Sequence, residues 1–276
     1  MTPPIKPLPP ELNNFLFELG PRKLVLVEGA DDAEVFEELY LDRLSKIAFF
    51  PTGGDERLEA LLQELLTQRP DVESFGIRDR DFQSDTDVEA SLTASGSRLF
   101  VLRRYCIENY LLEPLVVWYV LRVYLSKAFP WSSVKQAEEH LLKLCADMRT
   151  MMAANFVLRL QDALLFSKGH ELLSREVLVE AVAHRLSKDA ALVEAEIVER
   201  EAHIDERLHS LGTAYTCISG KHLLFHLFDF ARACDKKRRG LSEDYLFRQL
   251  LAQIKQQNLI HEDLREIVEQ KILAGS

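Results

Sequence analysis

The feature that most constrains the fold is a set of short apolar runs, each followed by a stretch with helical periodicity. The first run, Leu24-Val25-Leu26-Val27, has no polar position, as expected for a strand that is buried on both faces. Ile47-Ala48-Phe49-Phe50 has the same character, and residues 74–78 and 98–102 supply a third and a fourth short strand. Strands that alternate with helices favour a mainly parallel sheet.

The segments between these runs carry apolar side chains at helical spacing. Asp31 and Glu34 have the spacing of a capping box, which predicts Asp31 as the N-cap of the first helix. Asp55 is predicted to cap the second helix, whose apolar stripe is Leu58, Leu61, Leu62, Leu65 and Leu66. Residues 83–97 are polar and predict a loop near the end of the third strand, with Asp85 and Asp87 in solvent.

The second half of the chain has a different texture. From about Ile107 onward long amphipathic stretches dominate, and residues 214–218 are the one short strand-like exception. We therefore expect an α/β fold with a mainly parallel sheet flanked by helices, followed by a mostly α-helical C-terminal region. The expected divisions are an N-terminal arm and short helix (1–20), an α/β domain (21–112) and a helical region (113–276). Five prolines among the first ten residues predict that the arm is extended.

Composition narrows the classes of function. A formal net charge of -10 argues against indiscriminate nucleic-acid binding through bulk charge. It leaves room for a local basic channel, and the run Lys236-Lys237-Arg238-Arg239 is either part of such a groove or a solvated loop. The four cysteines form no CxxC pair, so neither a zinc framework nor disulfides are expected, and a reducing cytoplasm fits. No signal peptide or membrane span is expected, because the most apolar segment, 115–121, is too short.

Acidic residues follow two of the predicted strands. Glu28 comes directly after the first strand, and Asp79 and Asp81 come after the third with a spacing that puts both on one face of an extended backbone. The carboxyl ends of parallel strands share one edge of the sheet, which is where ligands bind in open α/β folds. Three carboxylates gathered there would repel one another unless they held a cation, and hard oxygen ligands suit Mg2+ or Mn2+.

Three ordered motifs carry a resemblance to a known family. Val27-Glu28-Gly29-Ala30-Asp31-Asp32, Asp79-Arg80-Asp81-Phe82 and Ile107-Glu108-Asn109-Tyr110-Leu111-Leu112 together resemble the TOPRIM core. That core is shared by topoisomerases, bacterial primases and the overcoming-lysogenization-defect nucleases. More narrowly, the motifs resemble a TOPRIM-like family of uncharacterised domains that accompany ATPases in bacterial anti-phage defence systems. The resemblance covers residues 23–115, and Ser219-Gly220-Lys221 extends it loosely into the helical half.

The resemblance implies a metal-dependent nuclease that uses Mg2+ or Mn2+ to hydrolyse phosphodiesters of DNA or RNA, transfer RNA included. It implies an ABC-type ATPase as partner and is compatible with a homodimer. Glu28, Asp79 and Asp81 would be catalytic and would bind metal together with Asp32. The chain departs from the classical pattern because no glycine follows soon after Asp81.

Further residues have roles by the same resemblance. Arg80, Arg103, Arg104 and Lys221 would bind substrate, and the supporting residues would be Gly29, at a tight turn after the strand, Glu108 and Asn109.

Several alternatives stay open at this point. Asp32 is either a ligand or an acid favoured by the dipole at a helix start. Arg78 and Arg80 either pair with the neighbouring carboxylates or grip substrate phosphate. Arg103-Arg104-Tyr105 is either a phosphate clamp with a stacking aromatic ring or a solvated strand exit, and Asn109 is either a helix cap or part of the site. The whole chain could also be a catalytically silent TOPRIM-fold module that binds a partner or nucleic acid. Nucleotidyl transfer, a third alternative, would need a nucleoside-triphosphate site that the sequence does not reveal.

Overall fold

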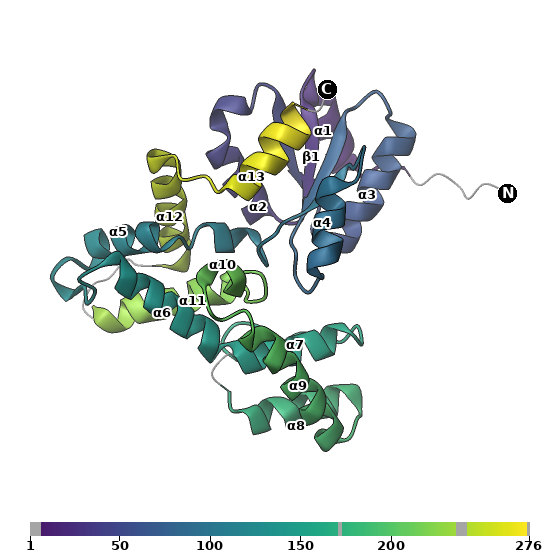
Figure 1. Cartoon of the computed structure of the whole chain (residues 1–276). Coiled ribbons are helices and arrows are strands. Elements are labelled where there is room, and N and C mark those ends of the chain that lie inside the picture. Colours follow the sequence, from purple (N-terminus) through teal and green to yellow (C-terminus); the bar gives the residue numbers. More distant parts are fainter. Residues whose placement is uncertain (1–6, 171–172, 236–241, 275–276) are drawn as a thin grey trace. The chain divides into compact units, whose positions relative to one another are not determined.

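The computed structural model describes residues 7–170, 173–235 and 242–274 (Figure 1). It contains two compact units, one made of Met1–Arg103 with Ile254–Ser276 and the other of Arg104–Gln253. The predicted fold class is confirmed, since a parallel sheet flanked by helices is followed by a helical region. The boundary between the units falls after Arg103, whereas the sequence analysis placed the end of the α/β domain at residue 112. The last part of the chain belongs to the α/β unit, although the sequence analysis assigned it to the helical region.

The α/β unit is built on a four-stranded sheet in the order β2-β1-β3-β4. The strands are β1 (Lys23–Val27), β2 (Ile47–Pro51), β3 (Ser74–Arg78) and β4 (Leu99–Val101), and all pairs are parallel. Val27, at the end of β1, is in register with Pro51 of β2 and Ile77 of β3. The carboxyl ends of these three strands therefore finish level, and the residues that follow them meet at one edge.

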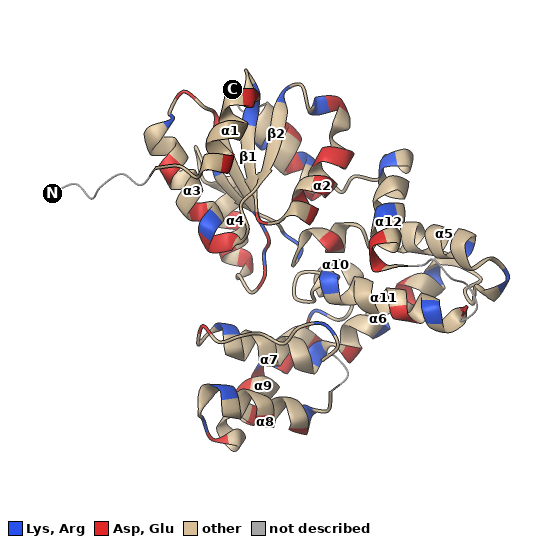
Figure 2. Ribbon diagram, turned by 180° about the vertical axis from the view of Figure 1, so that it is seen from behind, with Lys and Arg blue, Asp and Glu red and all other residues tan. Residues whose placement is uncertain are grey.

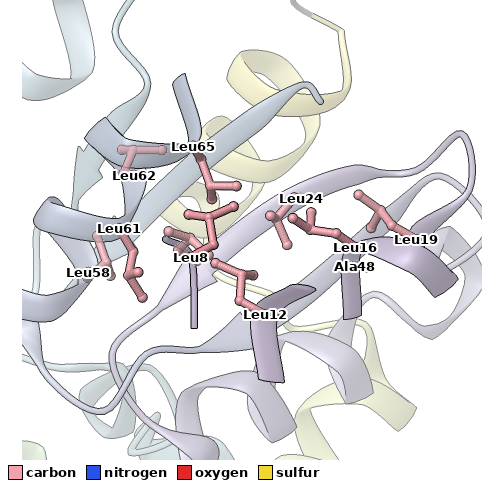
Figure 3. Packing of buried hydrophobic residues seen from close by; sticks show 11 residues of the cluster. Leu8, Leu12, Leu16, Leu19, Leu24, Ala48, Leu58, Leu61, Leu62 and Leu65 are labelled. Atoms are coloured by element: carbon pink, nitrogen blue, oxygen red, sulfur yellow. The ribbon is translucent and has the colours of Figure 1, made fainter. Parts of the chain in front are cut away.

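Helices cover the sheet on both faces. Leucines of α1 and α3 form a buried cluster with Leu24 of β1 and Ala48 of β2 (Figure 3). On the opposite face the ring of Phe36 from α2 stacks on Phe49 of β2, with ring centroids 5.2 Å apart. Burying each such side chain contributes about 2 kcal/mol. The helical elements of this unit are α1 (Pro10–Leu19), α2 (Ala30–Leu39), η1 (Leu41–Arg43), α3 (Asp55–Gln68), α4 (Asp85–Thr93), α13 (Glu262–Arg265) and the π-helix η4 (Glu266–Leu273).

Three local predictions in this unit are wrong. The predicted loop 83–97 contains α4, because Ser84 caps it by accepting a hydrogen bond from the backbone N–H of Asp87 (3.2 Å), and Val88 and Leu92 are buried. The N-caps of α2 and α3 are Gly29 and Gly54 in place of the predicted Asp31 and Asp55.

The described residues of the second unit contain helices and no strands. Its elements are η2 (Ile107–Tyr110), α5 (Pro114–Leu125), η3 (Ser126–Ala128), α6 (Val134–Asp147), α7 (Arg149–Arg159), α8 (Arg175–Leu186), α9 (Ala190–Asp205), α10 (Leu211–Ala214), α11 (Gly220–Cys234) and most of α12 (Glu243–Gln257). The strand-like segment 214–218 is not a strand, because the N–H of Ile218 bonds the carbonyl of Ala214 (3.0 Å) in a helical turn. Both signs of charge are interspersed along the helices (Figure 2).

Two predictions fall partly or wholly outside the described residues. The cationic run Lys236–Arg239 lies outside them, and so does the first part of the proline-rich arm. The described end of that arm is anchored, since Leu8 is buried against the leucine cluster. Among the described helices, none has the length and apolar character that a membrane crossing requires.

Candidate functional site

Glu28 and Asp79 meet at the carboxyl edge of the sheet. Val27 and Ile77 are in register, so the chain leaves β1 and β3 side by side. The backbone N–H of Asp79 donates a hydrogen bond of 2.9 Å to Oε1 of Glu28. Asp79 is buried, with 4% of its surface exposed. The structure therefore brings together the two acidic motifs that are 51 residues apart in the sequence.

The electrostatics of Glu28 show that further carboxylates lie near it. Its pKa is raised from 4.5 to about 7, first by burial and next by the negative charge of Asp81. The charges of Asp32 and Asp55 raise the pKa further, while the hydrogen bond from Asp79 lowers it. This edge of the sheet thus holds a crowded set of acids, and near neutral pH Glu28 is poised between its protonated and ionised forms.

Asp55 is a member of this set that the sequence analysis assigned only to helix capping. It is the first residue of α3, and the loop before it folds back on β1. The N–H groups of Gly53 and Gly54 donate to the carbonyl of Glu28 at 2.8 and 3.0 Å. Their φ angles of 87° and 134° lie in the region that favours glycine. The position of Asp55 in the sequence could have indicated its place in this set. Asp55 follows β2, and residues that follow parallel strands lie on the same edge of the sheet, as Glu28 and Asp79 do.

Asp32 has a structural role in addition to its charge. Its Oδ2 accepts a hydrogen bond of 2.7 Å from the N–H of Gly29, and the side chain is buried. Gly29 itself is extended, with φ -125° and ψ 170°, so the predicted tight turn at this glycine is wrong. The change of direction occurs where α2 starts, and Asp32 secures it by binding the N-cap N–H.

The turn Asp79–Asp81 is held in shape by Arg80. Asp81 has a φ of 49°, a left-handed conformation that aspartate tolerates better than most residues. The buried guanidinium of Arg80 donates to the carbonyls of Gln83 and Arg103, each at 3.1 Å, and pairs with Asp85. These contacts are those of a residue that positions the turn between the two aspartates.

Two other arginines near this edge of the sheet, Arg78 and Arg103, also contact protein carboxylates. Arg78 pairs with Glu59 and, at 3.5 Å, with Asp55 on α3. Arg103 binds Glu89 (2.8 Å) of α4 and Glu266 (2.7 Å) of the π-helix, and these partners raise its pKa. The sequence left two roles open for Arg78 and Arg80, namely pairing with carboxylates or gripping substrate phosphate. In the structure both arginines form ion pairs, and their partners are Asp55, Glu59 and Asp85.

The remaining motif residues lie in the helical unit and form a tight junction of their own. Asn109 is fully buried; its Oδ1 accepts from the N–H groups of Cys106 and Gly220, both at 3.1 Å, and its Nδ2 donates to Ile218 (3.0 Å). The ammonium of Lys221 lies 4.0 Å from a carboxylate oxygen of Glu108. The loose match at Ser219-Gly220-Lys221 is thus in contact with Glu108-Asn109, and Asn109 acts as a cap.

Arg104 is also fixed within this unit. Its guanidinium donates to the carbonyl of Asn109 (2.9 Å), pairs with Glu113 (2.7 Å) and lies over the rings of Tyr110 and Tyr215. Tyr105, the predicted stacking aromatic, is buried. The sequence analysis offered a solvated strand exit as one interpretation of Arg103-Arg104-Tyr105. Arg104 and Tyr105 do not fit it, because both are buried.

Searches with models of known protein families find no match to this chain, and a comparison with curated proteins finds none either. The resemblance to the TOPRIM core therefore rests on the motifs themselves. Within the described ranges no three His, Cys, Asp or Glu side chains are arranged as a ready-made metal-binding group.

Proposed function

We propose that this chain is a metal-dependent phosphodiesterase of the TOPRIM type that cleaves DNA or RNA. The observation that carries the proposal is the effect of Asp81, Asp32 and Asp55 on Glu28, whose pKa they help to raise to about 7 at the edge where β1 and β3 end. Acids crowded in this way fit a divalent cation, because its charge offsets their repulsion and carboxylate oxygens are the ligands that Mg2+ and Mn2+ prefer.

Glu28, Asp79 and Asp81 would hold this cation, with Asp32 as an additional ligand. When bound, such a cation polarises a phosphoryl oxygen and lowers the pKa of its water. The chain's own contribution begins with orientation, since the N–H of Asp79 fixes one oxygen of Glu28 and Arg80 fixes the turn that carries Asp81. A carboxyl with a pKa of about 7 can also accept or return a proton at neutral pH.

The finer parts of the proposal rest on the family resemblance. It makes the chain the effector of an anti-phage defence system, coupled to an ABC-type ATPase, and a cytoplasmic protein. The helical unit would then hold substrate, dimerise or dock on the ATPase. The junction of Glu108, Asn109 and Lys221 supports a function of that unit beyond packing, because it joins the third motif to the segment that extends the resemblance loosely into the helical half.

The test is a cleavage assay on plasmid, single-stranded DNA and total tRNA, with Mg2+, Mn2+ or EDTA. We expect metal-dependent cleavage that Glu28→Gln and Asp81→Asn abolish. Glu139→Gln is the matched control, because Glu139 is exposed on α6 and pairs only loosely with Lys135 (3.7 Å). Cleavage that persists in EDTA, or in both site variants, would contradict the proposal.

A second candidate is a silent TOPRIM-fold module that binds nucleic acid or the ATPase without turnover. The contacts of Arg80, Arg103 and Arg104 favour it, because all three guanidinium groups are engaged with protein partners. Retention of a labelled oligonucleotide without cleavage, unchanged in Glu28→Gln, would support this candidate over the nuclease.

A further inference from the structure

A cavity of about 620 Å3 opens at the amino edge of the sheet, at the opposite ends of the strands from the acidic residues. It lies where the chain enters β1, β2 and β3, and its volume is typical of sites for small molecules. Its charged lining consists of Arg22, Lys23, Lys46, Arg69, Asp71 and Glu73. Four cations thus face two carboxylates, in a chain whose net charge is -10.

The two carboxylates are already matched by two of the cations. Lys23 forms an ion pair of 2.9 Å with Glu73. Arg69 binds both oxygens of Asp71, at 2.9 and 2.7 Å. Arg22 and Lys46 are left as a surplus of two positive charges, and within the described parts of the chain neither has a carboxylate partner.

Arg22 is held in place without being neutralised. Its Nε and Nη2 donate to the carbonyls of Leu19 and Glu18 at the end of α1, at 2.8 and 2.9 Å. These bonds orient the guanidinium at the cavity and leave its charge for a ligand. Lys46 lines the same cavity. Its carbonyl accepts a hydrogen bond of 2.9 Å from the N–H of Lys23, the residue that follows Arg22, and its side chain is exposed to solvent.

The rest of the lining is largely apolar. Leu16, Leu19 and Pro21 come from α1 and the turn after it, and Val72 and Leu273 complete the wall. A cavity whose lining is mainly polar, with a smaller apolar part and two uncompensated cations, suits a ligand that joins an organic ring to an anionic group. Phosphate is the anion that arginine and lysine recognise best together, through planar donors and a point charge.

We propose that this cavity binds a phosphorylated small molecule of nucleotide size, with its phosphate on Arg22 and Lys46 and its organic part against the apolar wall. The site is separate from the acidic edge. The five residues of β1 lie between the two, which corresponds to about 16 Å at roughly 3.3 Å per residue. It therefore does not depend on the proposed nuclease activity and can be tested without it.

The test is calorimetric titration of the full chain with ADP, pyrophosphate and adenosine, in EDTA so that no divalent cation bridges a phosphate to the acidic edge. We expect ADP to bind, pyrophosphate to bind more weakly and adenosine not to bind. Lys46→Glu should weaken ADP binding roughly tenfold or more, because it replaces a charge-assisted contact by repulsion. Asp81→Asn should leave the affinity unchanged.

Lys135→Glu is the matched control, since Lys135 is an exposed lysine of α6 and the charge change is the same. Arg22→Gln, checked by thermal unfolding, gives a second variant on the other cation. The proposal is overturned if wild type binds neither ADP nor pyrophosphate at millimolar concentration, if adenosine binds as well as ADP, or if Lys46→Glu and Arg22→Gln both bind ADP like wild type.

Discussion

The backbone N–H of Asp79 donates a hydrogen bond of 2.9 Å to Oε1 of Glu28, which joins the ends of two neighbouring parallel strands. The bond fixes a carboxyl whose pKa is raised to about 7 by burial and by nearby acids. Orientation, crowding and a pKa near neutrality coincide in one side chain, and this coincidence is the basis of the proposed chemistry.

Glu28 should make the protein less stable as pH rises from about 4.5 to about 7 in EDTA. Its pKa is higher in the folded state than the unfolded value of 4.5, so the folded state binds more protons in this window and stability falls with pH. Glu28→Gln removes the penalty and should raise the free energy of unfolding at pH 8 by about 2 kcal/mol. Urea unfolding of wild type and Glu28→Gln at pH 4.5 and pH 8 measures this change in the free energy of unfolding. An equal pH dependence in the two proteins would show that the pKa of Glu28 is not raised in the folded state.

Cation affinity should depend on pH in the opposite sense. In the proposed site Mn2+ binds ionised Glu28, so the affinity should fall as pH drops below about 7 and change little above it. Calorimetric titrations at pH 6, 7 and 8 give the profile. An affinity that is flat across this range would show that Glu28 takes no part in binding.

Arg80→Ala should destabilise the α/β unit by roughly 2–4 kcal/mol, because it leaves Asp85 and two carbonyls without the buried guanidinium. The left-handed turn at Asp81 should loosen as well, so Mn2+ binding should weaken. Arg43→Ala is the control, since Arg43 is exposed and pairs with its neighbour Asp42. A stability equal to that of the control would contradict the positioning role of Arg80.

Gly220→Ala should destabilise the helical unit by about 3 kcal/mol. An added Cβ would lie 2.4 Å from the backbone nitrogen of Asn109, too close for any relaxation of a side chain to relieve. At Gly212, by contrast, the nearest atom is 3.9 Å away, so Gly212→Ala should change stability by less than about 1 kcal/mol. Similar thermal unfolding of the two variants would mean that the junction at Asn109 is not tight.

The strands and the meeting of Glu28 with Asp79 were predictable because they follow from local pattern and from one topological rule. Apolar runs with no polar position mark β1 and β2, and parallel strands must release their carboxyl ends at one edge. Asp55 obeys the same rule, yet its place at the start of a helix suggested capping. The N-cap of this helix is Gly54, whose φ of 134° depends on how the loop packs over β1. The spacing of apolar residues in the helix does not predict this conformation.

The periodicity of apolar residues does not predict contacts between segments that are far apart in the sequence. Residues 254–274 look like more of the helical region, but the carbonyl of Ile272 accepts from Lys23 (2.7 Å) and Glu266 pairs with Arg103. Helix α4 was missed because only Val88 and Leu92 are buried on it, too few for a recognisable stripe. Likewise, the arginines expected to bind substrate have protein partners that no spacing rule identifies.

The most direct test of the account is calorimetric titration of Mn2+ into the full chain at pH 8, where Glu28 is ionised. We predict a saturable binding event that Glu28→Gln and Asp81→Asn each weaken by roughly tenfold or more, while Glu139→Gln leaves it unchanged. No binding to wild type, or equal binding to wild type and both site variants, would contradict the claim that this edge of the sheet holds a catalytic cation.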